Sequence, residues 1–159
     1  MLDLDPVRLD QHVNTLRHGG LITTGPGSGD LVETVVQALV IDSLSYEHYE
    51  VVDSADASPG DLDEDMQHLL ATTEHRRDQA GPGWEATPLA PRILWILRYP
   101  ERTGGRARFL ASRACRLLHR QSGIHLLVIT AGTHALIQAA GPAGVSLAAE
   151  AGALGRLDL

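Results

Sequence analysis

Short runs of apolar residues alternate along this chain with segments in which apolar residues recur every three or four positions. The runs predict strands at 20–24, 48–53, 92–99 and 124–130, and a last short strand over 155–159. Runs such as RILWILRY and IHLLVIT are apolar almost throughout, which suits parallel strands covered on both faces. We therefore expect the first, third and fourth strands to lie side by side and parallel, flanked by helices.

The periodic segments predict helices between these strands. The first helix begins at Asp5 as N-cap, with Pro6 at the first helical position. The remaining helices are 31–41, 62–77, 107–123 and one or two short ones in the Ala-rich segment after 130. Strands that alternate with helices predict the α/β class, as a three-layer α/β/α sandwich with a mainly parallel sheet of four to five strands.

One domain is expected over 1–159, since a chain of 159 residues suits a single core. The longest loop, 78–91, has three prolines and two glycines and is too short for a domain linker. We interpret it as a surface excursion in which Trp84 is a candidate contact residue. Trp95, by contrast, is expected in the core.

A glycine-rich turn joins the first strand to the second helix and is the candidate phosphate loop. Small residues let the backbone curl so that N–H groups converge, and the helix N-terminus adds partial positive charge. The loop pattern G-x-x-x-x-G-K-[ST] also needs a lysine and a hydroxyl. When Gly29 is taken as the second glycine, the other three diagnostic places do not match. Thr24 stands in place of the first glycine, Asp30 in place of the lysine and Leu31 in place of the hydroxyl residue. The candidate cofactor-binding residues of this turn are Thr24, Gly25, Gly27, Ser28, Gly29 and Asp30.

Asp30 has two interpretations. The segment DLVE reads as a capping box, with Asp30 as N-cap and Glu33 three residues later. The aspartate would then be the helix's own anion, and Asp30→Ala would cost about 0.5–2 kcal/mol. The alternative is a remodelled nucleotide site, in which a like charge near the phosphates costs roughly 1 kcal/mol in water and about 4 at an intermediate dielectric. We favour the structural cap.

The second half of an NTPase site is an acidic residue at the end of the third strand, which holds Mg²⁺. Here the strand runs into Arg98 and Tyr99, and Glu101 follows a proline and is expected to point elsewhere. The metal-binding hydroxyl and the metal-binding acid are therefore both missing. The sequence predicts no catalytic residue and no metal site.

The order of these elements resembles the α/β core of the AAA+ family of P-loop ATPases, including inactive members of clamp-loader type. The resemblance rests on LITTGPGSGD at the Walker A place, RILWILRYPE at the Walker B place and IHLLVIT at the sensor-1 strand. It implies a P-loop-type sheet and makes Thr130 the sensor-1 residue and a further candidate for cofactor binding. The chain stops where the family's helical lid would begin, and no arginine finger can be assigned. The resemblance thus implies a pseudo-ATPase core.

Other residues of chemical interest have structural interpretations that we favour. Ser28 lacks the glycines of a hydrolase nucleophile elbow. Asp53 could mimic a ribose-binding acid but reads better as a strand-end residue. His68 and His75 read as exposed helix histidines, and Cys115, among arginines that could lower its pKa, as a small buried residue. The acidic run 61–66 starts like a calcium loop but has Met66 where glycine is required.

Composition narrows the function classes. A net charge of −7 argues against a nucleic-acid or anionic-membrane surface, although 102–116 carries five arginines. One cysteine permits no internal disulfide, no apolar run nears the roughly 20 residues of a membrane span, and the N-terminus lacks a signal pattern. A cytoplasmic location is expected.

These observations favour a non-catalytic domain that acts as a protein-interaction or regulatory subunit without a cofactor. The partner is another protein, either a second copy or a different chain. Two alternatives stay open: an ATP- or GTP-binding protein with weak or partner-completed hydrolysis, and a small-ligand binding module that uses the crevice at the strand ends.

Overall fold

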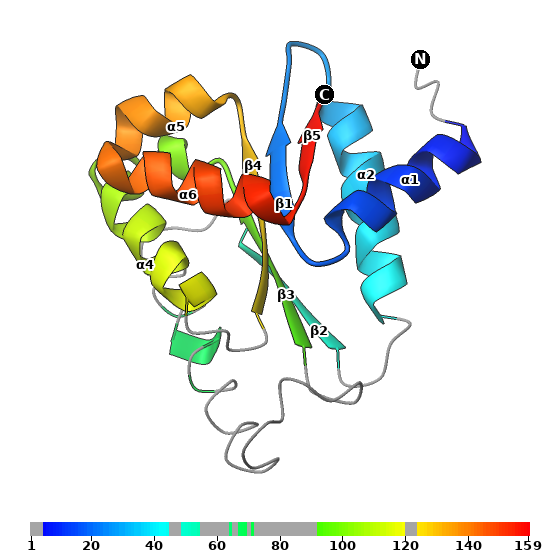
Figure 1. The fold of residues 1–159 in the computed structure, drawn as a ribbon, viewed down its shortest axis with the longest axis horizontal. Coiled ribbons are helices and arrows are strands. Elements are labelled where there is room, and N and C mark those ends of the chain that lie inside the picture. Colours follow the sequence, from blue (N-terminus) through cyan, green and yellow to red (C-terminus); the bar gives the residue numbers. More distant parts are fainter. Residues whose placement is uncertain are drawn as a thin grey trace.

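A computed structural model describes residues 5–44, 49–54, 64, 67–69, 71, 92–119 and 124–159. Its centre is a five-stranded sheet in the order β2-β3-β4-β1-β5, in which all neighbours are parallel (Figure 1). The strands are β1 (Gly20–Thr23), β2 (Tyr49–Ser54), β3 (Arg92–Arg98), β4 (Ile124–Thr130) and β5 (Arg156–Asp158).

The predicted neighbours are confirmed. β4 lies between β3 and β1, with Trp95 opposite Leu126 and Leu21 opposite Val128. The short strand expected at the end of the chain is also present, and it pairs with β1 at the edge of the sheet. β1 is therefore an inner strand although it is the first in the chain.

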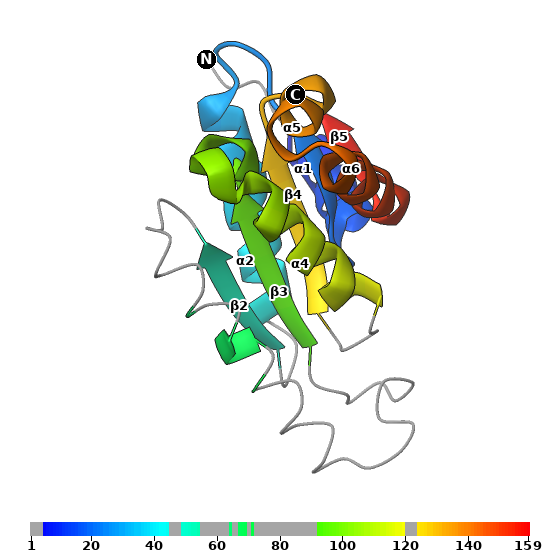
Figure 2. The ribbon, with the colours of Figure 1, turned by 90° about the vertical axis from the view of Figure 1, so that its left-hand side faces the viewer.

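Helices cover both faces of the sheet, which makes the expected three-layer α/β/α sandwich. α1 (Pro6–Leu16) and α2 (Gly29–Leu44) lie on one face, and α4 (Ala107–His119), α5 (Thr133–Ala140) and α6 (Pro142–Leu154) lie on the other (Figures 1 and 2). Each face of the sheet has its own hydrophobic core, and successive side chains of β3 point alternately into one and the other. Leu94 and Ile96 pack towards α1 and α2, while Ile93, Trp95 and Leu97 pack towards α4, α5 and α6. Trp95 is fully buried, as expected.

Local sequence signals explain where several helices start. Asp5 caps α1 by accepting the Arg8 amide at 2.8 Å, and Pro6 follows at the first helical position. Proline also opens α6 at Pro142. The second helix was expected from 31 but begins at Gly29, and the helix expected from 107 is preceded by a 3-10 helix, η2 (Pro100–Arg106).

Several expectations fall partly or wholly outside the described residues. Of the helix expected over 62–77, only 64, 67–69 and 71 are described, and these are helical. The loop 78–91 with Trp84, most of the acidic run 61–66, and His75 lie outside them. Within the described part of the chain, no helix combines the length and the apolar character that crossing a membrane requires.

Candidate functional site

The carboxyl ends of all five strands meet at one edge of the sheet, where ligands bind in open parallel sheets. Three of the predicted motif places come together there. The glycine turn follows β1, Arg98 ends β3, and Thr130 ends β4. Backbone pairing joins the first and third, because the Thr24 amide donates to the Thr130 carbonyl at 2.9 Å.

The glycine turn is a tight β-turn rather than a wide loop. The Ser28 amide donates to the Gly25 carbonyl at 3.2 Å, and Gly27 has a φ of 76°. With Pro26 at the second position, these features define a type II turn, which needs a positive φ at its third residue. The Ser28 hydroxyl closes the same turn, donating to the Gly25 carbonyl at 2.6 Å. The Ser28 amide is thus used inside the turn and Pro26 has none, which leaves fewer N–H groups for an anion than a phosphate loop presents.

The capping-box interpretation of Asp30 is wrong in its geometry. The first helical bond of α2 runs from the Val32 amide to the Ser28 carbonyl at 2.9 Å, which makes Ser28 the N-cap position. Gly29 is the first helical residue and Asp30 the second, with an exposed side chain. Within the described residues, the Asp30 carboxylate accepts no hydrogen bond, so it acts on the helix start only through its charge.

The predicted partner in the capping box, Glu33, is used elsewhere. Its carboxylate pairs with the guanidinium of Arg98, which approaches it with both terminal nitrogens. The Arg98 side chain is only 14% exposed and Glu33 is 54% exposed. A cation therefore fills the place at the end of β3 where an NTPase presents a metal-binding acid, and it is tied to the helix that follows the glycine turn.

The chain turns sharply after β3. Tyr99 has a φ of 47°, in the left-handed region that non-glycine residues rarely occupy, and its ring stacks under Arg102 at 3.9 Å. This turn directs η2 back towards the end of β4. It also overturns one expectation, because Glu101 does not point elsewhere.

Glu101 closes the turn between β4 and α5. Its Oε2 accepts hydrogen bonds from the Thr130 hydroxyl at 2.6 Å and the Ala131 amide at 3.0 Å, while its buried Oε1 has no hydrogen-bond partner among the described residues. The Thr130 hydroxyl also lies 3.3 Å from the Gly132 amide, whose hydrogen bond it accepts. Thr130, expected from the sequence at a sensor-1 place, is fully buried, and its hydroxyl contacts Glu101 and Gly132.

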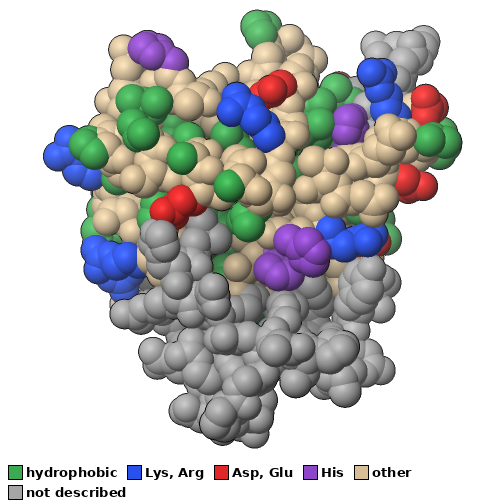
Figure 3. Space-filling model, in the orientation of Figure 1, with side chains coloured by type: hydrophobic (Ala, Val, Ile, Leu, Met, Phe, Trp, Pro, Cys, Tyr) green, Lys and Arg blue, Asp and Glu red, His purple; other side chains and the backbone are tan. Residues whose placement is uncertain are grey.

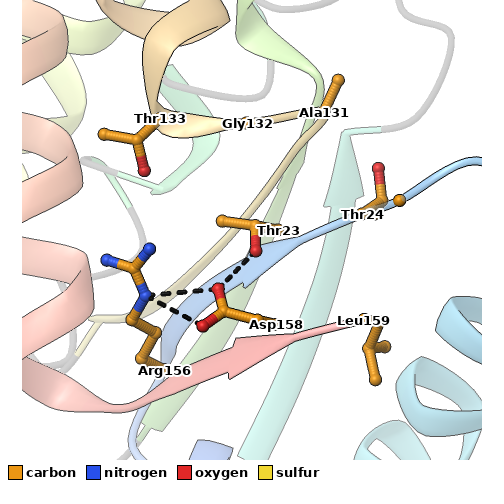
Figure 4. A pocket seen from close by; sticks show the side chains of 9 residues that line it. Thr23, Thr24, Ala131, Gly132, Thr133, Arg156, Asp158 and Leu159 are labelled. Atoms are coloured by element: carbon orange, nitrogen blue, oxygen red, sulfur yellow. Dashed lines mark hydrogen bonds and ion pairs between the residues drawn. The ribbon is translucent and has the colours of Figure 1, made fainter.

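An open cavity of about 450 Å³ lies on the α5 and α6 side of this edge, at the ends of β1, β4 and β5 (Figure 4). Thr23, Thr24 and Gly25 line it from β1 and the turn, and Ala131, Gly132 and Thr133 from the start of α5. β5 adds a third wall, through Arg156, Asp158 and Leu159.

A chain of three side chains crosses the floor of the cavity. The Thr23 hydroxyl donates to Asp158, whose carboxylate accepts Arg156 Nε at 3.2 and 3.4 Å. The hydrogen bond from Thr23 is the largest cause that holds the pKa of the Asp158 carboxyl below its usual value; burial opposes it, and the charge and hydrogen bond of Arg156 lower the pKa further. The two terminal nitrogens of Arg156 point away from Asp158, towards the side where Thr133 lies (Figure 4).

The sequence predicts a crevice at the strand ends, but of the residues that line this cavity it names only Thr24 and Gly25 as candidates. The residues that reasoning from the sequence missed are Thr23, Thr133, Arg156 and Asp158. A short strand that ends in charged residues was the available signal, since GRLDL places Arg156 and Asp158 two apart on one face. The sequence alone does not show that β5 lies next to β1, because that follows only from the order of the strands in the sheet.

The remaining candidate residues from the sequence are Ser28, Cys115, His68 and Asp53. Ser28 is buried in its turn. Cys115 is buried, and burial together with nearby Glu150 raises the pKa of its thiol to about 12, so the neighbouring arginines do not activate it. His68 is exposed, and the side chain of Asp53 lies outside the described residues. Among the described residues, no three of His, Cys, Asp and Glu gather as metal ligands.

No family model, curated protein or solved structure matches this chain. The groups at the strand ends can bind through hydroxyls, backbone amides and one Arg–Asp pair. They include no nucleophile paired with a base among the described residues.

Proposed function

We propose that this chain is a single cytoplasmic domain of P-loop type, resembling the AAA+ core, that has no ATPase activity and acts as a protein-interaction or regulatory subunit. The observation that carries the proposal is the ion pair between Arg98 and Glu33. It puts a positive charge at the strand end where Mg²⁺ would need a carboxylate.

Two further features support a non-catalytic role. The turn before α2 uses the Ser28 amide internally, and Asp30 adds a negative charge where a phosphate would sit. A cofactor is therefore not part of the proposal. The alternative is a protein that binds Mg-ATP and hydrolyses it only with a partner. Binding of Mg-ATP in the experiment that follows would favour this alternative.

The test is a comparison of the parent protein with Asp30→Lys. We expect neither to hydrolyse Mg-ATP above background, and calorimetry to detect no micromolar binding by either, because Leu31 and Arg98 still occupy the metal places. Arg98→Asp in the Asp30→Lys background serves as the matched control, since it restores a carboxylate at the end of β3. Turnover by the parent that is lost on changing Ser28 or Thr130 would overturn the proposal, as would micromolar binding by Asp30→Lys alone.

A small-ligand binding module is the second candidate, and the cavity beside β5 favours it. Three threonine hydroxyls and the Arg156–Asp158 pair line a space large enough for a small polar molecule. Two-dimensional NMR with phosphate and with ribose tests it. Signals of Thr23 and Thr133 should shift with one of these probes, and Arg156→Gln should abolish the shift; unchanged spectra with both would remove this candidate.

A further inference from the structure

α4 has a strongly one-sided division of side chains. Its inner face consists of small and apolar residues that are buried against the sheet and α6: Ala107, Leu110, Ala111, Ala114 and Cys115. Its outer face carries arginines around one aromatic residue. Figure 2 shows α4 as the outermost layer on its side of the molecule, in front of β3 and β4.

Four residues form one stripe on that outer face. They are Arg106, the last residue of η2, and Phe109, Arg113 and Arg116 of α4. Their spacings are three, four and three, which keeps side chains on the same side of a helix. We call these four residues the arginine stripe. It spans eleven residues of chain, or about 15 Å along the helix.

The centre of the stripe is an exposed aromatic ring held between two cations. Phe109 is 44% exposed, and the guanidinium carbons of Arg106 and Arg113 each lie 5.8 Å from its ring centroid. This distance is within the range of cation–π attraction, which holds planar guanidinium groups beside an apolar surface. Arginine with an exposed aromatic is the composition of interface centres, in which the ring anchors the contact and arginine binds carboxylates with two parallel hydrogen bonds.

Charge distinguishes the stripe from the rest of the molecule. The segment 102–119 contains five arginines and no acidic residue, in a chain whose net charge is −7. A surface this basic on an acidic protein attracts a short acidic segment locally. A long polyanion would meet the repulsion of the whole molecule as well, which disfavours nucleic acid.

We infer that the arginine stripe binds an acidic amphipathic helix of another protein. This inference rests on the proposed interaction role and names its surface and partner class. Apolar side chains of the partner cover Phe109, and carboxylates spaced a helical turn apart pair with Arg113 and Arg116. The contact is salt-sensitive, because its charged groups lie at the surface.

Fluorescence anisotropy with the full chain tests the inference. The probe is a labelled helical peptide of about 15 residues, to match the stripe, with leucine on one face and glutamate beside it. Its counterpart carries glutamine in place of every glutamate, and a short DNA duplex is the third probe. We expect the acidic peptide to bind, the glutamine peptide to bind about tenfold more weakly, and rising salt to weaken the acidic peptide's binding.

Substitutions in the full chain test whether the peptide binds at the arginine stripe. Arg113→Glu should weaken the acidic peptide about tenfold or more, and Phe109→Ser by several-fold. Arg8→Glu makes the same charge change on an exposed arginine of α1, across the sheet, and should change affinity less than about twofold. Thermal melts of each variant verify folding, and Arg116→Glu replaces Arg113→Glu if the latter does not fold.

Three results would overturn the inference: no binding of the acidic peptide, equal loss with Arg8→Glu and Arg113→Glu, or tighter binding of DNA than of peptide. Each of them leaves the non-catalytic proposal intact if Mg-ATP is still not hydrolysed. Hydrolysis by the parent overturns that proposal whatever the peptide does.

Discussion

At the scale of single residues, the start of α2 shows a charge stabilising a helix without capping it. Asp30 is the second residue of the helix, and its carboxylate faces solvent. It acts on the partial positive charge of the whole first turn, which is an effect that salt screens. A capping side chain would instead satisfy one particular amide.

The two mechanisms predict different results for two substitutions. Because only the charge matters, Asp30→Asn and Asp30→Ala should each cost about 0.3–1 kcal/mol at low ionic strength, less in high salt, and nearly the same amount. Urea unfolding of both variants at two salt concentrations measures this. If Asp30 were the cap, asparagine would be almost neutral while alanine would cost up to about 2 kcal/mol.

Asp158 makes a prediction about pH. Its folded-state pKa lies below the ordinary value, so its contribution to stability is complete above that value and is lost as pH falls through the lower folded-state pKa. Thr23 is the largest cause, and Thr23→Val should therefore raise the titration midpoint of this carboxyl more than Arg156→Gln does. Carboxyl-carbon NMR titration follows the midpoint directly. A midpoint that moves only with Arg156→Gln would contradict this account.

At the scale of elements, α6 packs closely against α5 because Gly144, in the first turn of α6, has no side chain where the two helices meet. A Cβ on Gly144 would lie 2.6 Å from the Leu136 carbonyl oxygen and 3.1 Å from the Ala140 Cβ, both of α5. The opposing atoms are backbone and a fixed methyl, which cannot move aside cheaply. Gly152, in the same helix, has only an ordinary contact, at 3.9 Å from Leu21 Cδ2.

Alanine at these two glycines should therefore have opposite effects. Gly152→Ala gains helix propensity and should stabilise the protein by up to about 1 kcal/mol. Gly144→Ala makes the same gain but forces α5 and α6 apart, and should cost about 1–3 kcal/mol. Thermal unfolding of the pair gives the comparison. Two variants of equal stability would mean that the helices separate without cost.

At the scale of the whole molecule, the layers were predictable because apolar runs and helical periods report burial directly. RILWILRY and IHLLVIT are covered on both faces, as such runs predict. The site was less predictable, because its contacts join residues far apart in sequence. Nothing near Glu101 in the chain shows that the left-handed turn at Tyr99 returns it to Thr130. Likewise, Arg98 pairs with Glu33 across 65 positions.

The place of β1 in the sheet also sets the order in which the protein can fold. Both neighbours of β1 come from the last quarter of the chain, with Leu21 opposite Val128 on β4 and opposite Arg156 on β5. During synthesis, β1 stays unpaired until the chain has grown past 124–158, and the part of the core that β1 and β4 contribute beside α2 stays open until then. Closing loops of this length makes folding slow compared with a helical bundle and leaves apolar surface exposed to aggregation or chaperone capture meanwhile. A ribosome-bound fragment ending at residue 119 would hold β1 with neither of its partners.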